Sequence, residues 1–445
     1  MRRVLVANRG EIALRVIRAC RELGLETVAV YSSADETALH VRRADEAIFI
    51  GKAPARHSYL NSEALVDAAR KAGADAVHPG YGFLAENSDF ARLCDDAGLV
   101  WIGPRAEVIE KMGDKALARE IASEAGVPVV PGSDGTVMPG DARERSEGIG
   151  YPVMIKAAGG GGGTGIRIAV NDDELGQRID EAAREAQAAF GNPALYLEKL
   201  IPLPRHVEVQ VLGDGNGSMI HLYERECSIQ RRRQKLLEET PSPALDPRTR
   251  EEIAAAAVRL AVAAGYTSAG TVEFLVDDGG AFYFIEMNTR IQVEHPITEM
   301  TSGVDLVKEQ LRIAAGESLR LSQDDIHPRG ASIEFRITAE DPDADFQPSP
   351  GKVTSLELPG GPGVRIDSAL YHGYEVSPFY DSLVAKLVIW GWDRDDAIAR
   401  GRRALEEFKI EGIPTTIPFH LRLLDDSGFR EGNYHTEYLT RQHLE

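Results

Sequence analysis

The sequence predicts an α/β domain, then a small α+β flap, then a larger α+β body, and three features predict this order. Strands and amphipathic helices alternate over the first quarter of the 445 residues. A run of glycines then joins two short strands. Later strands alternate polar and apolar residues, so each has one face suited to a core and one suited to a site. The length suits about three domains.

The first domain is predicted over residues 1–112. An apolar strand at 4–8 leads into an amphipathic helix at 11–23, and Gly24 follows as its stop. A strand at 27–32 and a helix at 61–72 continue the βαβ rhythm of a doubly wound sheet. The glycine triplet of a dinucleotide-binding loop is missing after the first strand, so the dehydrogenase alternative is the weakest.

The second unit, residues 113–203, is predicted to be a linker and a lid. Six of the seven residues 159–165 are glycine, and the run joins predicted strands at 152–158 and 166–170. Both dinucleotide loops and P-loops open a helix, which this loop does not. We therefore expect a mobile hairpin that closes over a nucleotide, with Lys156 as a phosphate-binding cation. A flexible surface turn is the alternative.

Residues 285–296 are the most informative segment of the predicted body, residues 204–445. Two glutamates, an asparagine, an arginine and a glutamine occupy every second position: Glu286, Asn288, Arg290, Gln292 and Glu294. If the segment is extended, these side chains share one face and the intervening apolar residues share the other. The mixture of Glu-x-Asn with an arginine beside an acid favours an active-site lining over a solvated strand.

Other polar residues in apolar strands extend this predicted site. His206, Glu208 and Gln210 form one face of a valine-rich strand, and Glu273 interrupts another apolar strand. Because a buried carboxylate needs a partner, Glu273 is predicted to join Glu286 and Asn288 as oxygen ligands of Mg²⁺. A surface pair between Glu273 and an arginine is the alternative.

Composition narrows the class of protein. The formal net charge of −20 argues against nucleic-acid binding. An anionic substrate would need a local cationic site, and residues 230–235 supply one, with four positive charges among six residues. The three cysteines suit free thiols in a reducing compartment. Neither a signal peptide nor a membrane-length apolar run is present, so we expect a cytoplasmic protein without membrane contact.

Eight segments carry a family pattern in a fixed order: residues 7–13 (ANRGEIA), 78–84 (HPGYGFL), 112–115 (MGDK), the glycine loop, 204–208 (PRHVE), 230–232 (QRR), 286–296 and 334–337 (EFRI). The resemblance that these segments carry, from residue 1 to about 440, is to biotin carboxylase, a member of the ATP-grasp superfamily. It implies an ATP-grasp fold with a doubly wound N-terminal domain, a mobile lid and a C-terminal body. It also implies ATP-dependent carboxylation of biotin N1 by bicarbonate through carboxyphosphate, with Mg²⁺ or Mn²⁺.

The resemblance assigns roles to matching residues. It implies catalytic roles for Glu294 as the base and for Arg290, Arg336 and Lys235; bicarbonate binding by Lys235, Arg290, Gln292, Val293 and Glu294; and biotin binding by Tyr81 and Arg336. The implied metal ligands are Glu273, Glu286 and Asn288. The implied nucleotide-binding residues are Lys115, Lys156, Gly161, Gly162, Gly163, Glu198, Lys199, Ile201, His206, Gln230, Arg233 and Leu275.

Two residues depart from the family pattern. Thr164 stands in the glycine loop where relatives more often have Arg or Lys, and Arg233 stands where many have His. We expect Arg233 to replace part of the lost loop cation.

The resemblance also implies partners: a biotin carboxyl carrier protein, carboxyltransferase subunits, and a second copy in a homodimer through the first helix and the region after residue 350. No biotin-attachment motif occurs, so we expect a stand-alone enzyme that acts on a separate carrier; a piece of a larger carboxylase is the alternative. Two other functions stay open. One is another ATP-grasp ligase that joins a carboxylate to an amine, and the other is an ATP-binding regulatory module.

Overall fold

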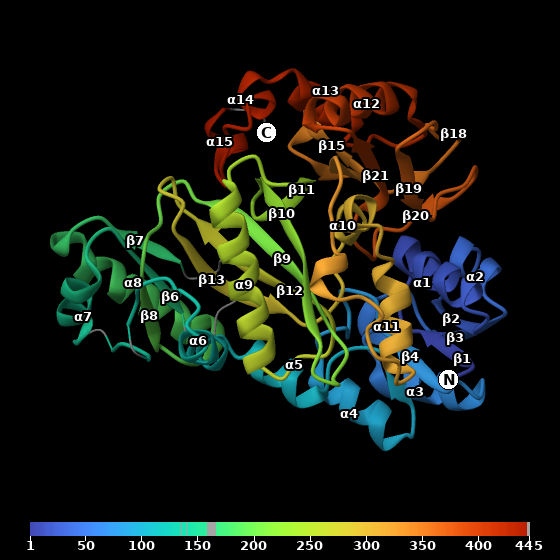
Figure 1. Ribbon diagram of the computed structural model, residues 1–445, viewed down its shortest axis with the longest axis horizontal. Helices are drawn as coiled ribbons and strands as arrows, with labels where there is room; N and C mark the ends of the chain where they lie inside the picture. The colour runs from blue at the N-terminus through green and yellow to red at the C-terminus, as the bar shows by residue number, and fades with distance from the viewer. Residues whose placement is uncertain (134, 139, 158–165, 443–445) are drawn as a thin grey trace.

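The first domain is a doubly wound sheet, as predicted. The computed structural model describes residues 1–133, 135–138, 140–157 and 166–442 (Figure 1). Five parallel strands lie in the order β3-β2-β1-β4-β5. Their bounds are β1 Arg3–Val6, β2 Glu26–Ser32, β3 Glu46–Gly51, β4 Ala76–His78 and β5 Val100–Trp101. The helices are α1 Gly10–Glu22, α2 Leu39–Arg43, α3 Ser62–Lys71, α4 Ser88–Asp96 and α5 Ala106–Gly113, with a 3₁₀ turn at Ala55–His57.

The second unit projects from the rest of the molecule, at the left of Figure 1. Its three-stranded sheet has the order β7-β6-β8, with β6 Val153–Ala157, β7 Arg167–Ala169 and β8 Leu195–Lys199. Its helices are α7 Ala142–Ile149 and α8 Asp172–Phe190, and α6 Lys115–Glu124 precedes it. β6 and β7 are antiparallel neighbours, so the two strands predicted to flank the glycine run are confirmed. The run itself, with Gly161, Gly162, Gly163 and Thr164, lies outside the described residues.

The body is built on an eight-stranded antiparallel sheet of order β13-β12-β9-β10-β11-β14-β21-β19. The strands are β9 Arg205–Gly213, β10 Met219–Arg231, β11 Gln234–Thr240, β12 Ser268–Val276, β13 Phe282–Asn288, β14 Ala331–Thr338, β19 Val364–Ser368 and β21 Leu383–Gly391. Three short strand pairs flank it: β15 Glu340–Asp341 with β16 Gln347–Pro348, β17 Gly351–Lys352 with β20 Glu375–Val376, and β18 Ser355–Glu357 with β22 Lys409–Glu411.

Helices cover this sheet from both sides (Figure 1). The helices of the body are α9 Pro247–Ala263, α10 His295–Ser302, α11 Leu306–Ala314, α12 Arg394–Glu407, α13 Ile417–Asp425, α14 Ser427–Arg430 and α15 Tyr438–Arg441, with 3₁₀ turns at Gln323–Asp325 and Pro342–Ala344. No helix of the described residues is long and apolar enough to cross a membrane.

The packing of α9 decides which face of the sheet carries the polar residues. The valines of β9 and the apolar residues of β12 share one buried core with Ile253 and Leu260 of α9. Side chains alternate along a strand, so the intervening polar residues of β9 and β12 point to the opposite face. Because α9 packs on one face of the sheet, the acids of separate strands lie together on the other face.

Candidate active site

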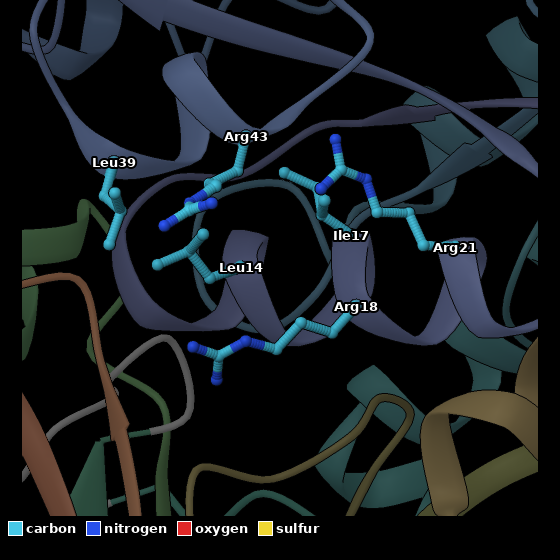
Figure 2. Close-up of a pocket in the computed structure, with 6 residues that line it drawn as sticks. All are labelled: Leu14, Ile17, Arg18, Arg21, Leu39 and Arg43. Carbon is cyan, nitrogen blue, oxygen red and sulfur yellow. The ribbon is translucent and has the colours of Figure 1, made fainter.

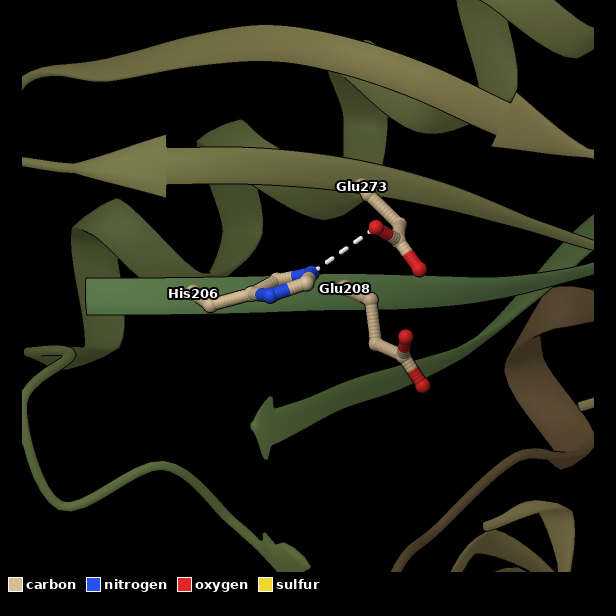
Figure 3. Close-up of side chains that lie close together, drawn as sticks. All are labelled: His206, Glu208 and Glu273. Atoms are coloured by element: carbon tan, nitrogen blue, oxygen red, sulfur yellow. Dashed lines mark ion pairs between the residues drawn. The ribbon is translucent and has the colours of Figure 1, made fainter. Parts of the chain in front are cut away.

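Three carboxylates lie in a row across neighbouring strands. Strand register places Glu273 of β12 directly between Glu208 of β9 and Glu286 of β13. Figure 3 shows Glu208 and Glu273 beside His206, the first polar residue of the same β9 face. Like charges directly opposite one another repel, so this row needs cations to remain ionised. Burial and the charge of Glu273 raise the pKa of Glu286.

Lys235 of β11 is the cation at the centre of this row. Its Nζ lies 2.7 Å from Glu208, 3.1 Å from Glu273 and 2.7 Å from Glu294. Burial alone would lower the pKa of Lys235, but the surrounding acidic groups raise it well above its ordinary value. Lys235 is therefore a fixed positive charge at neutral pH.

Glu273 is held in its ionised form by three hydrogen-bond donors and by the nearby ring of His206. Its Oε1 accepts hydrogen bonds from Lys235, from Asn288 Nδ2 at 2.9 Å and from Gln292 Nε2 at 3.0 Å. Its Oε2 lies 2.9 Å from His206 Nε2, the contact drawn in Figure 3. Burial opposes ionisation, yet Lys235 and His206 hold the pKa of Glu273 well below its usual range.

The segment after β13 is not one extended strand, so that part of the prediction is wrong. β13 ends at Asn288 and α10 begins at His295, with an irregular turn between them. The predicted polar residues converge nevertheless, because the turn carries them back over the sheet. Arg290 Nη1 donates to Gln292 Oε1 at 2.7 Å, and Arg290 Nε donates to Glu86 at 2.9 Å.

Glu294 ends this turn and is completely buried. Oε1 pairs with Lys235, and Oε2 accepts a hydrogen bond from Arg336 Nη2 at 2.9 Å. Burial would raise its pKa, but Lys235, Arg336 and Arg225 hold that pKa well below the usual range. As long as these cations face it, Glu294 is ionised and only weakly basic.

Arg336 of β14 is shared between two acids. Its Nε donates to Glu238 Oε1 at 2.6 Å, in addition to the bond from Nη2 to Glu294. Burial raises the pKa of Glu238 to about 7, despite the opposing effect of Arg336. A planar guanidinium fixed by two carboxylates suits the stabilisation of a planar anion.

The predicted cationic stretch does not act as one patch. Residues 232–233 form the turn between β10 and β11, where both have positive φ. Arg231 turns toward Asp345 and lies over the ring of Phe346, while Arg233 is exposed. Lys235 is the member of this stretch that reaches the acids. The one-patch prediction fails because successive residues of a hairpin face opposite sides.

The predicted nucleotide-binding residues lie on the lid and along the edge of the row. Lys156 of β6 pairs with Glu198 of β8, and Lys199 Nζ donates to the carbonyl groups of Gly150 and Tyr151 at 3.0 and 2.6 Å. Ile201 follows β8 and is buried. Leu275 of β12 lies opposite His206 of β9 in the strand register, and Gln230 donates a hydrogen bond to the carbonyl of Cys227. Lys115 Nζ lies 3.9 Å from Glu286.

The donor set fits a hard cation. Glu286 and Glu273 face each other across β12 and β13, and Asn288, two residues after Glu286, donates through Nδ2 to Glu273 and accepts through Oδ1 from Arg290. Oxygen ligands of this kind suit Mg²⁺, and a cation would relieve the repulsion that raises the pKa of Glu286. The ligand atoms of His206, Glu208 and Glu273 also lie within 4.8 Å of one another.

A separate hollow of about 310 Å³ lies between α1 and α2 and shares no residue with this site (Figure 2). Leu14, Ile17 and Leu39 form its apolar lining, and three arginine head groups surround it. The cluster of charged side chains around Lys235 and Glu294 therefore lies apart from this hollow, on the polar face of the large sheet.

Comparison with known proteins agrees with this geometry. Residues 1–109 match the family "Biotin carboxylase, N-terminal domain", residues 114–322 match "Carbamoyl-phosphate synthase L chain, ATP binding domain", and residues 334–441 match "Biotin carboxylase C-terminal domain". Biotin carboxylase 1 of Bacillus subtilis is 56% identical, over 99% of this chain and 98% of the relative. The chain belongs to the biotin carboxylase family. It is accordingly an ATP-grasp enzyme and an ATP-dependent ligase.

Solved structures of the family superpose along the whole chain. The biotin carboxylase domain dimer of Hydrogenobacter thermophilus 2-oxoglutarate carboxylase, in complex with MgADP, ADP and bicarbonate, has a TM-score of 0.93 at 54% identity and covers 100% of this chain and 98% of its own. A biotin carboxylase complex from Campylobacter jejuni has a TM-score of 0.94 at 48% identity, with 99% and 98% covered. The ATP-grasp fold class predicted from sequence is confirmed.

Sequence reasoning missed several residues that contact this cluster and its surroundings: Glu11, Glu86, Arg225, Glu238 and Lys386. Arg225 and Lys386 are completely buried in strands of the large sheet. A lone charge in an apolar run, as in residues 383–391, is a usable signal because a buried charge needs a partner. The partner of each could not be read from the sequence.

Proposed function

We propose that the cluster around Glu294 carboxylates N1 of biotin with bicarbonate, with hydrolysis of ATP to ADP and phosphate. The observation that carries this proposal is the convergence of Lys235 and Arg336 on one buried carboxylate, with Arg290 on the same turn. An enzyme that only joins a carboxylate to an amine has no need of this set. A regulatory module has no need to bury a base between two fixed cations.

Bicarbonate fits between Lys235 and Arg290, with Gln292 and the backbone N–H of Val293 as further donors. An anion bound there neutralises part of the positive charge that holds the pKa of Glu294 down. Substrate binding therefore increases the basicity of Glu294, which then takes the proton of bicarbonate. The deprotonated oxygen attacks the γ-phosphate of ATP to give carboxyphosphate. A base that is weak before substrate binds also limits futile hydrolysis of ATP.

ATP lies between the lid and the row of acids. Lys115 and Lys156 contact its phosphates, and the segment Glu198–Ile201 lies along the base. Glu273, Glu286 and Asn288 would hold Mg²⁺, which would supply charge neutralisation at the transferring phosphate.

Biotin lies beside Tyr81. Carboxyphosphate breaks into CO₂ and phosphate, the phosphate takes the proton of N1, Arg336 stabilises the resulting anion, and that anion adds to CO₂ to give carboxybiotin. The biotin is carried by a biotin carboxyl carrier protein, and carboxyltransferase subunits use the product. We expect a homodimer, as in the H. thermophilus domain structure. Relatives of nearly equal identity include one of the pyruvate carboxylase subunits of Methanothermobacter thermautotrophicus and the small subunit of H. thermophilus 2-oxoglutarate carboxylase, so identity does not select the final acceptor.

The test is ATP hydrolysis with Mg²⁺ and bicarbonate, with and without free biotin, for wild type and Glu294→Gln. We expect biotin-stimulated turnover that falls by about 10²-fold or more in the variant, because general-base catalysis contributes about 10²–10⁴-fold. Glu357→Gln, at an exposed ion pair with Lys409, is the matched control. Nucleotide binding by the wild type without bicarbonate- or biotin-dependent turnover would favour the other ligases or the regulatory module.

A further inference from the structure

A completely buried lysine connects the turn that carries Glu294 to the N-terminal domain. Lys386 lies in the middle of β21, and its Nζ donates to the backbone carbonyl of Val293 at 2.9 Å. The same Nζ lies 3.2 Å from Glu11 of α1. An ammonium group in a core is costly without partners. These two contacts explain how Lys386 can be buried, but not why a lysine occupies this position of an apolar strand.

The place of Lys386 in the sheet puts it beside the reacting groups. In the register of β14 and β21, Lys386 lies directly opposite Arg336, so both side chains point to the same face. The carbonyl that Lys386 holds belongs to the peptide unit that leads into Glu294. Fixing this peptide fixes the direction in which Glu294 leaves the backbone.

Glu11 fixes a second part of the site. Its Oε1 accepts a hydrogen bond from the hydroxyl of Tyr81, and Lys386 Nζ lies 5.8 Å from the centre of the Tyr81 ring. Asn8 holds the same segment from the other end, because its Nδ2 donates to the carbonyls of Pro79 and Tyr81 at 2.7 Å each. The motif at residues 7–13 is thus a clamp on the Tyr81 segment.

We propose that Glu11 and Lys386 are positioning residues: one buried ion pair that sets both the Val293–Glu294 peptide and Tyr81. It couples the bicarbonate side of the site to the biotin side and joins the N-terminal domain to the large sheet at that point. This inference rests on the proposed function, since it assigns a role to residues that touch neither substrate. Neither Val293 nor Tyr81, which the pair contacts, is among the predicted nucleotide-binding residues, so we expect the pair to leave nucleotide binding unchanged.

Two variants separate positioning from simple stability. Lys386→Met removes the donor to Val293 but leaves the Glu11 carboxylate buried with Tyr81 as its partner. The double variant Lys386→Met/Glu11→Gln also removes that charge, and replacing both members of a buried ion pair is often neutral for stability. The new amide at position 11 keeps an acceptor for Tyr81. Lys409→Met, at an exposed ion pair with Glu357, is the matched control.

The first measurement needs no turnover. Binding of bicarbonate to the MgADP-loaded protein is followed by ¹³C NMR, and MgADP affinity is measured by calorimetry. We expect both Lys386 variants to weaken bicarbonate binding about tenfold, while MgADP affinity stays within about twofold. We also expect kcat with free biotin to fall about 10²-fold with little change in KM for ATP, because a displacement of about 1 Å can cost that much.

Two results would overturn the inference. One is a double variant with wild-type bicarbonate affinity and kcat. The other is a parallel loss of MgADP and bicarbonate affinity, which is the mark of a merely structural role. Failure of the proposed function looks different: the wild type itself would then show neither bicarbonate binding nor biotin-dependent turnover, and the inference would fall with it.

Discussion

Arg225→Met removes a completely buried cation of the site. Both the guanidinium and its partner Glu208 have no exposed side-chain surface. Nε donates to Glu208, and the two Nη atoms donate to Gln210 at 2.7 Å, Thr298 at 3.0 Å and Thr271 at 3.1 Å. Methionine fills much of the volume but satisfies none of these acceptors.

The expected cost is about 3 kcal/mol of unfolding free energy. Breaking a buried ion pair from one side costs about 3–5 kcal/mol because the remaining charge is stranded. The lower end applies here because Glu208 keeps Lys235 as a partner at 2.7 Å. The double variant Arg225→Met/Glu208→Gln leaves no stranded carboxylate, and we expect it to recover about 2 kcal/mol of that loss.

Urea unfolding at neutral pH, followed by tryptophan fluorescence, measures these differences. The control is Arg248→Met, whose side chain is 86% exposed and pairs with Glu252 one helical turn away. We expect the control to stay within about 0.5 kcal/mol of wild type. A loss below about 1 kcal/mol for Arg225→Met, or no recovery in the double variant, would refute the view that Arg225 chiefly neutralises Glu208.

Three further predictions follow from single sites. Burial raises the pKa of Glu238 from 4.5 to about 7. The folded state therefore binds this proton more tightly than the unfolded state, and the protein loses stability as the pH rises through that window. Between about pH 5 and about pH 8, Glu238→Gln should gain about 3 kcal/mol of unfolding free energy relative to wild type, as measured by urea unfolding. Gly270→Ala should cost about 1–3 kcal/mol by thermal unfolding, because its Cβ would lie 2.4 Å from the Tyr266 ring, whereas Gly176→Ala in α8 meets nothing within 4 Å and should be neutral or stabilising. Arg233→Ala should raise KM for ATP severalfold, because the exposed Arg233 is expected to replace part of the charge that Thr164 does not supply in the glycine loop. An unchanged KM would contradict this role of Arg233.

The sequence was sufficient for the elements whose signal is local. The βαβ rhythm of residues 1–112, the strands that flank the glycine run and the apolar faces of β9 and β12 all follow from periodicity. The sequence also indicated that Glu273 would have charged or polar partners, because a lone carboxylate in an apolar strand needs one. The domain boundaries and the individual roles of the nucleotide-binding residues stay predictions.

The failures share a physical cause. Alternation at residues 285–296 predicted one extended face, yet Arg290, Gln292 and Glu294 lie on a turn between β13 and α10. Their side chains meet the same acids only because the turn folds back over the sheet. In the stretch 230–235, a two-residue turn sends Arg231 and Lys235 to different neighbours. In both cases the sequence predicted the right residue types for the cluster, but not the direction in which each side chain points.

What the sequence alone determined about this protein is its chemical inventory, the strands and helices with a clear local periodicity, and its family, since each is written in residue types and spacing. Only the tertiary structure decided which charges face one another. Lys235 lies 2.7 Å from Glu294, although 59 positions separate them in the sequence, and Lys386 of β21 lies 3.2 Å from Glu11 of α1. Electrostatic energy depends on these distances and on burial, and neither is a property of sequence separation.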